Sequence, residues 1–163
     1  MSVGPPVEAI YEEARNDVYY YLLSFGLTPD QAQDTTQDVF LKLHAAVRQG
    51  EQIRNPRAWV FKVAHNLGLN ARARASSQKG ADMDEMPELA DSRQGAEQNL
   101  LHRERLSRIQ DGLDALSPQQ RRSLYLRAEG LRYQEIAEVM GVSLSTVSEY
   151  VTRAVARLRK AVV

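Results

Sequence analysis

Cysteine is absent from this sequence, and histidine occurs only three times in 163 residues. The lack of cysteine excludes disulfides, thiolate catalysis and cysteine-ligated zinc. His44, His65 and His102 are not spaced as metal ligands, so we expect neither a metal site nor a cofactor. Long apolar runs are also missing, which excludes insertion of a helix into a membrane. No signal peptide follows Met1, and we therefore expect a soluble, cytoplasmic protein.

The net charge is zero because 21 basic residues balance 21 acidic ones, but the charges are unevenly distributed. Residues 1–38 carry seven acidic residues and residues 82–97 carry six, each against a single arginine. Six basic residues and no acid lie in 52–81, and four basic residues and no acid lie in 153–160. Two basic blocks beside acidic ones indicate two separate contacts with polyanions. Solvated helix faces would explain any single block equally well.

The periodicity of apolar residues and the signals at helix starts predict an all-α protein. Thr28-Pro29 and Ser117-Pro118 each combine an N-cap with a first-turn proline and a glutamine three residues after the cap. Asn55-Pro56 is a further cap followed by proline. Helices are expected near 6–25, 29–48, 56–75, 95–115, 118–129, 133–140 and 144–161.

A polar, acidic segment divides these helices into two groups. Residues 76–91 contain serine, glycine, proline and several acids but few apolar residues, which is typical of a flexible linker. We therefore expect two small helical domains, at 1–76 and 95–163, joined by a flexible acidic linker at 77–94.

Residues 133–147 have the pattern of a helix-turn-helix. Gly141 stands where the turn needs a left-handed residue, and Ala137 is small where the two helices would cross. Five apolar residues share one arc of the second helix, namely Val147, Tyr150, Val151, Ala154 and Leu158. The opposite face carries small polar side chains and a cation, which suit the major groove of DNA. An ordinary helical hairpin with glycine at its turn is the alternative.

The helix expected at 29–48 has two distinct faces. Its inward arc contains Ala32, Thr36, Val39, Phe40, Leu43 and Val47. The opposite arc carries Asp34, Gln37, Asp38 and Leu41, and a leucine within an acidic face suits docking of a basic protein partner. An isolated surface leucine is equally common in proteins.

The helix expected at 56–75 combines cations, amides and aromatic residues. Lys62, His65, Asn66 and Arg72 lie opposite its apolar arc, and Trp59 is close by. This combination suits single-stranded nucleic acid, through backbone pairing and base stacking. Core packing of Trp59 and simple solvation of His65 are the alternatives.

Three segments in order along the chain resemble extracytoplasmic-function (group IV) sigma factors of the sigma-70 family. The stretch QAQDTTQDVFLKL at 31–43 is similar to the polymerase-docking motif of that family. The stretch NPRAWVFKVAHN at 55–66 is similar to its promoter-melting segment. Residues 116–122 and the helix-turn-helix resemble its C-terminal domain, so the resemblance covers nearly the whole chain.

The resemblance implies an alternative sigma factor that binds core RNA polymerase and directs promoter-specific initiation, and it implies no enzyme. Residues expected to bind the polymerase are Asp34, Gln37, Asp38 and Leu41. Residues expected to bind the −10 element as an opened single strand are Arg54, Arg57, Trp59, Lys62, His65, Asn66, Asn70, Arg72 and Arg74. Residues expected to bind the −35 element as duplex are Ser145, Thr146, Ser148, Glu149, Thr152, Arg153 and Arg157. The loop at 49–55 is the expected base pocket.

The resemblance also implies that regulation comes from a separate protein. The sequence ends at Val163, shortly after the helix-turn-helix, so we expect no accessory sensing domain. The usual regulator in the family is an anti-sigma factor. Because two DNA contacts act together on one polymerase, the free chain is expected to bind DNA weakly.

Two positions depart from the family pattern in the docking motif. Acids are usual where Gln31 and Gln33 stand, so this motif carries less negative charge. Thr35 is expected to project sideways, and a phosphate there would restore about −1.5 to −2 charges. Thr35 is therefore a candidate phosphorylation site, although helix capping is a sufficient reason for Gln31.

Glu149 is a further departure, because the family often has a small or basic residue there. Glutamate repels phosphate but accepts a hydrogen bond from N4 of cytosine, so Glu149 is expected to read a base.

Other classes of function fit the sequence less well. A stand-alone helix-turn-helix regulator would use residues 1–75 for sensing or dimerisation, but these residues show no ligand-pocket pattern. An adaptor that binds polymerase without opening DNA is a third reading. An enzyme fits least, since no nucleophile–base set, phosphate-binding glycine loop or metal cluster is present.

Overall fold

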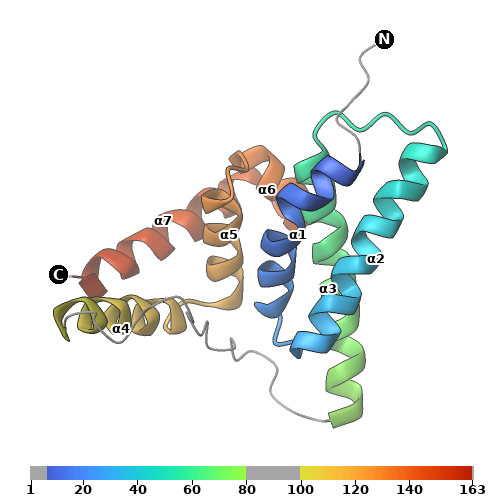
Figure 1. Ribbon diagram of the computed structural model, residues 1–163. Coiled ribbons are helices and arrows are strands. Elements are labelled where there is room, and N and C mark those ends of the chain that lie inside the picture. Colours follow the sequence, from blue (N-terminus) through green and yellow to red (C-terminus); the bar gives the residue numbers. More distant parts are fainter. Residues whose placement is uncertain (1–6, 80–99, 163) are drawn as a thin grey trace.

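The computed structural model describes residues 7–79 and 100–162, which contain seven helices and no strand (Figure 1). The helices are α1 (Val7–Leu23), α2 (Pro29–Arg48), α3 (Pro56–Lys79), α4 (Leu100–Asp114), α5 (Pro118–Ala128), α6 (Tyr133–Met140) and α7 (Leu144–Val162). The all-α prediction is confirmed. Because α3 runs to Lys79, the first three positions of the predicted linker at 77–94 are helical; the others lie outside the described residues.

The helix starts follow the capping signals of the sequence. Thr28 Oγ1 accepts a hydrogen bond of 3.2 Å from the backbone N–H of Gln31, whose side chain accepts one of 2.9 Å from Thr28 N–H. Ser117 and Gln120 form the same reciprocal pair at the start of α5. Such pairs satisfy backbone donors that the first helical turn leaves without partners. Gln31 therefore has a structural task.

Helices α1, α2 and α3 form an N-terminal unit around a shared apolar core. Val18, Leu22, Leu43 and Phe61 are all fully buried within it. The predicted inward arc of α2 is correct except for Val47, which is 45% exposed, whereas Ala46 is buried. In the last turn of α2 the buried side continues through Leu43 and Ala46, and Val47, the next position around the helix, is left partly exposed.

Helices α4 to α7 form a C-terminal unit in which α4, α5 and α6 each pack on α7. Gly141 ends α6 with φ of 69°, the left-handed conformation that the sequence predicts for the turn. Val147, Val151 and Ala154 of α7 are buried, and Tyr150 and Leu158 are half-buried, so this predicted arc faces inward.

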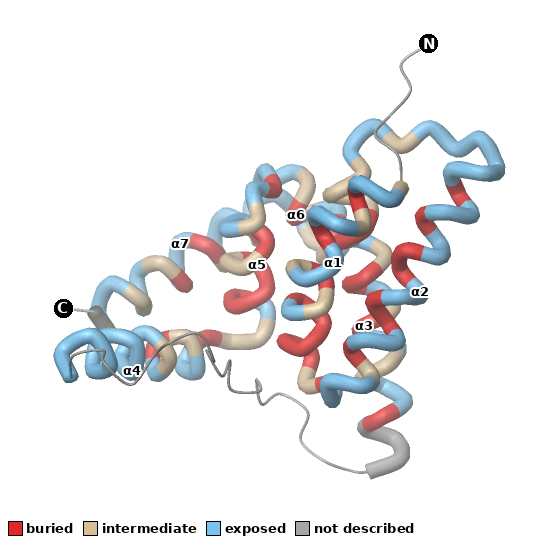
Figure 2. Tube along the Cα trace, in the orientation of Figure 1, coloured by how far each residue is buried: buried red, intermediate tan, exposed pale blue. Residues whose placement is uncertain are grey.

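The two units pack against each other through α1, α3, α5 and α6. Their buried side chains form one continuous cluster, and Figure 2 shows buried segments facing each other across the boundary. The rings of Tyr21 and Tyr125 lie 5.6 Å apart, and the Arg122 guanidinium lies 4.0 Å from the centre of the Phe25 ring. Helix α6 contacts α3 directly, which brings the helix-turn-helix next to the start of α3.

Candidate nucleic-acid interfaces

The outer face of α2 presents the four residues predicted to dock a protein. Asp34, Gln37 and Asp38 are exposed, and Leu41 is 65% exposed beside them. Exposure of a leucine among acids leaves apolar surface within reach of a partner that carries basic residues. The structure thus places the predicted group together on one open surface.

Thr35 does not belong to that open surface, and the expectation that it projects sideways is wrong. Its side chain is only 8% exposed, and Oγ1 donates a hydrogen bond of 2.8 Å to the backbone oxygen of Gln31. Thr36 makes the same kind of bond to Ala32. A kinase needs a free hydroxyl, so Thr35 is not a modification site in this conformation. The physical reason is that both threonines lie in the row of α2 that packs on α1 and α3.

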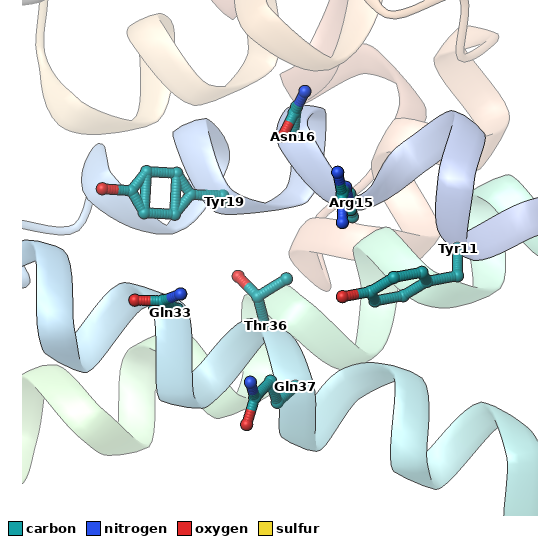
Figure 3. A pocket seen from close by; sticks show the side chains of 7 residues that line it. All are labelled: Tyr11, Arg15, Asn16, Tyr19, Gln33, Thr36 and Gln37. Carbon is teal, nitrogen blue, oxygen red and sulfur yellow. The ribbon is translucent and has the colours of Figure 1, made fainter.

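A polar cleft of about 390 Å³ lies between α1 and α2 and was not anticipated from the sequence. Figure 3 shows the side chains that line it, namely Tyr11, Arg15, Asn16, Tyr19, Gln33, Thr36 and Gln37. The Arg15 guanidinium lies 5.4 Å from the centre of the Tyr11 ring. The two helices supply opposite walls, so neither segment alone carries a recognisable signal.

The exposed face of α3 carries a row of polar residues at helical spacing. Lys62, Asn66, Asn70 and Arg74 are exposed, and each follows the previous one by four residues. Residues with this spacing share one side of a helix. Arg54 is exposed on the preceding loop, and Arg72 is half-buried. The row gives a polar strip with two cations and two amides, as the predicted −10 surface requires.

His65 is not part of that strip, so its predicted contact with DNA is wrong for this conformation. The side chain is 5% exposed, and Nδ1 shares a hydrogen bond of 2.7 Å with the Tyr21 hydroxyl. Burial, and then the positive charge of Arg122, lower the pKa of His65 to about 4, so the ring is neutral near pH 7. His65 lies on the side of α3 that packs against α1, whereas the adjacent Asn66 points to solvent.

Arg57 is also unavailable to DNA here, because its guanidinium joins the two units. Its Nη2 lies 2.9 Å from Asp17 Oδ2 and 2.5 Å from Glu129 Oε2, and its Nε donates to the Glu129 backbone oxygen at 3.1 Å. We call these three residues the Arg57 clasp. Burial and the nearby Asp17 carboxylate raise the pKa of Glu129, although Arg57 opposes this. Burial lowers the pKa of Arg57, but hydrogen bonding to Asp17 and the carboxylate charges raise it overall.

A second cavity, of about 450 Å³, separates the loop before α3 from α6. Arg54, Trp59 and Lys62 line one side, and Glu135 and Glu138 line the other. The sequence suggests either core packing or base stacking for Trp59. The side chain is half-buried, which lies between these two expectations. The side-chain amide of Asn55 donates to the Glu135 carboxylate across the boundary. The loop at 49–55, the predicted base pocket, therefore contributes one wall of this cavity, and α6 contributes the opposite wall.

Most of the predicted DNA face of α7 is open to solvent. Ser145, Ser148, Glu149, Thr152 and Arg153 are exposed, and the Glu149 and Arg153 side chains form an ion pair of 2.7 Å. Thr146 is half-buried, and its Oγ1 is 2.7 Å from Ser143 Oγ, within the hydroxyl group cluster that caps α7. Arg157 is exposed as well, and its Nη1 donates to the Ala115 backbone oxygen at 2.6 Å in the α4–α5 turn, so its contact with DNA stays a prediction.

Within residues 7–79 and 100–162 no group of His, Asp or Glu side chains is arranged to hold a metal ion. None of the helices described in these ranges has the length and hydropathy needed to cross a membrane.

In the comparisons with known proteins, the similar proteins are sigma factors. The model of Sigma-70 region 2 matches residues 10–78, and that of Sigma-70 region 4 matches residues 106–158. The ferric citrate uptake sigma factor FecI of Escherichia coli is 33% identical over 76% of this chain and 72% of its own length. YlaC of Bacillus subtilis is 26% identical over 94% of this chain and 90% of its own length.

One curated relative is considerably longer than this chain. SigE of Mycolicibacterium smegmatis is 32% identical over 85% of this chain, which spans 55% of the SigE length. Two solved structures share the fold at 21% identity and each cover 94% of this chain. RpoE of Bartonella quintana, in complex with the anti-sigma factor NepR, has a TM-score of 0.71 and is covered over 94% of its length. CnrH, in complex with the cytosolic domain of CnrY, has a TM-score of 0.59 and is covered over 85%.

Proposed function

The chain belongs to the extracytoplasmic-function sigma factors of the sigma-70 family, and we propose that it binds core RNA polymerase and directs initiation at a specific set of promoters. The observation that supports this most is the presence of two separate open faces on one chain. The acidic face of α2 with Leu41 suits a protein partner, and the polar face of α7 suits duplex DNA.

The proposed docking site for the polymerase consists of Asp34, Gln37, Asp38 and Leu41. Leu41 supplies apolar area that leaves water on binding, and the two carboxylates supply charge that orients a basic partner. Gln31 and Gln33 reduce the charge of this surface relative to the family pattern. The Thr35 hydroxyl is engaged within the helix, so phosphorylation of this residue is not part of the proposal.

The proposed −10 contact uses the exposed strip of α3 and the loop before it. Lys62 and Arg74 are placed to pair with phosphates, and Asn66 and Asn70 between them are placed to hydrogen-bond. Trp59 is half-buried and lines the cavity between this loop and α6, where we expect it to stack on a base. Opening a base from the stack costs a few kcal/mol, so this contact needs the polymerase and the second DNA contact to hold the chain in place.

The proposed −35 contact uses the exposed side of α7 in the major groove. Ser145, Ser148, Glu149 and Thr152 present short polar groups to base edges, while Arg153 is positioned near the backbone. A separate regulatory protein is a further proposed partner, since one structural relative is bound to the anti-sigma factor NepR and the other to the cytosolic domain of CnrY.

The decisive experiment measures binding of the full chain to purified bacterial core RNA polymerase, in parallel with duplex DNA alone. We expect tight binding to core and weak binding to duplex by the free chain. Tight duplex binding without any core binding would contradict the proposal and favour the stand-alone helix-turn-helix regulator. Core binding with no stimulation of promoter opening on genomic DNA would favour the adaptor.

A further inference from the structure

We propose that the contact between the start of α3 and helices α5 and α6 is an autoinhibitory latch. In the free chain it holds part of the proposed −10 surface against carboxylates of the C-terminal unit. The inference rests on the proposed function, because it takes the start of α3 and its preceding loop as a DNA surface. It adds that part of this surface, centred on Arg57, is engaged by the chain itself, without a separate inhibitor.

The first step is that two polar residues at the start of α3 already have partners across the boundary. Arg57 makes hydrogen bonds to Asp17, to the Glu129 carboxylate and to the Glu129 backbone oxygen. Asn55 donates to Glu135. Charge-assisted hydrogen bonds of this kind are the strong class of polar contact. A strand of DNA that used Arg57 would have to displace two carboxylates first.

The second step concerns the charge of the covering surface. Across the 450 Å³ cavity from Arg54 and Lys62 lie Glu135 and Glu138 of α6, together with Arg132, which is ion-paired with Glu135 at 3.4 Å. These carboxylates have the same sign as phosphate groups and stand opposite the cations of the −10 surface. Entry of a nucleic-acid strand would bring like charges together, which disfavours binding in the closed form. With two carboxylates against one guanidinium, the covering wall keeps an excess of negative charge, which opposes a phosphate backbone in this cavity.

The third step is that the latch leaves the other two proposed interfaces open. Asp34, Asp38 and Leu41 on α2 are exposed, and so is the polar face of α7. The closed chain is therefore competent to meet the polymerase before it meets the −10 strand. A partner that binds the open form more tightly shifts the population toward it. The latch would then limit single-strand binding to chains that are already held by polymerase.

The test uses the natural lack of cysteine, which allows two labels to be placed at His44→Cys in α2 and Ala156→Cys in α7, both exposed. The distance between labels is compared in the parent chain and in a Glu129→Gln, Glu135→Gln variant. Affinity for a mixed-sequence single-stranded oligonucleotide is measured on the same proteins. If the parent is closed nine times in ten, the variant should bind about tenfold more tightly.

The matched control is the double variant Glu104→Gln, Asp111→Asn, which also removes two carboxylates, from the exposed side of α4. We expect the latch variant to show a longer or broader label distance and tighter oligonucleotide binding, and the control to show neither. An unchanged distance would overturn the proposal. So would a gain in DNA affinity as large in the control, because general charge would then account for the effect.

A reversible lock tests the same proposal if the double variant folds poorly. Asn55→Cys and Glu135→Cys, whose parent side chains are hydrogen-bonded, are joined by a cleavable bismaleimide. Oligonucleotide binding should be weaker in the joined protein and recover after cleavage, because the exposed strip of α3 stays open in both forms; binding that joining leaves unchanged would contradict the latch. Core polymerase binding is measured in parallel. Its absence in every form would contradict the proposed function, while the label distance would still decide the latch.

Discussion

The hydroxyl of Tyr125 donates a hydrogen bond of 2.7 Å to the backbone oxygen of Asp17, although 108 positions separate the two residues. Asp17 lies on α1 and Tyr125 on α5, so this bond joins the N-terminal and C-terminal units. It lies beside the Arg57 clasp, which uses the Asp17 side chain. Asp17 of α1 therefore receives one bond from the C-terminal unit, at its backbone oxygen, and one from Arg57 of its own unit, at its carboxylate; Arg57 in turn binds Glu129 across the boundary.

Replacing Tyr125 by Phe should weaken the contact between the units. The change removes the hydroxyl and keeps the ring against Tyr21, so the free energy of unfolding should fall by about 1 kcal/mol. Urea unfolding followed by circular dichroism measures this. Tyr150→Phe, on half-buried Tyr150 of α7, is the matched control. Equal effects of the two changes would show that the bond to Asp17 has no particular importance.

Stability should fall in mild acid because of His65. Its pKa is about 4 in the folded chain and about 6.5 in an unfolded one, so the unfolded chain binds a proton first as the pH falls. The stabilisation is complete above pH 6.5 and is lost progressively toward pH 4, by an amount of about 3 kcal/mol in total. Urea midpoints at pH 7, 5.5 and 4.5 measure this loss.

A His65→Gln variant should show a flatter dependence over the same pH window. His44→Gln removes an exposed histidine and should leave the parental dependence in place. If His65→Gln keeps the full slope, another group is responsible for the acid sensitivity.

Leu41→Ala should weaken binding to core polymerase about tenfold and leave stability almost unchanged, because the side chain is 65% exposed in the free chain. Leu100→Ala is the matched control, since Leu100 is a 71% exposed leucine on α4. Binding to core is measured by fluorescence anisotropy of a labelled chain. An equal loss in both variants would argue against a specific docking role for Leu41.

Glu149→Ala should relax base preference at one position of the −35 element. Glutamate discriminates through a hydrogen bond to cytosine N4, so the loss of selectivity should be about 1–3 kcal/mol at that position. Because Arg153 loses its partner in the 2.7 Å ion pair, overall affinity for DNA should rise slightly. Selection from a randomised duplex with the polymerase-bound chain measures both effects. Uniform tightening at every sequence would mean that Glu149 only repels phosphate.

Local signals in the sequence predicted most of the helices because those signals act within a few residues. The capping pairs at Thr28 and Ser117 and the left-handed Gly141 are confirmed at their expected positions. The open face of α2 and the buried arc of α7 follow from helical periodicity. The capping bonds lie within single helix starts, and the arc of α7 follows from the period of its own sequence although α4 and α5 cover it.

The predictions that are wrong concern residues whose partners lie far along the chain. His65 and Arg57 belong to a basic, amide-rich helix, and nothing near them in sequence indicates Tyr21 or Glu129. Thr35 was misplaced for a simpler reason: a threonine at the border of an apolar arc turns inward when its hydroxyl bonds to the backbone four residues earlier.

The sequence by itself determined the helices, their caps, the helix-turn-helix and the resemblance to a sigma factor, because periodicity, capping and turn chemistry are properties of short segments. Only the tertiary structure decided which of the candidate DNA-binding residues are open. Their exposure depends on how α3 packs against α1, α5 and α6. This packing buries some polar side chains, while others only one position away stay exposed to solvent. Arg57 is ion-paired with both Asp17 and Glu129. These three residues come from segments far apart in the chain, so no local sequence pattern encodes their contact.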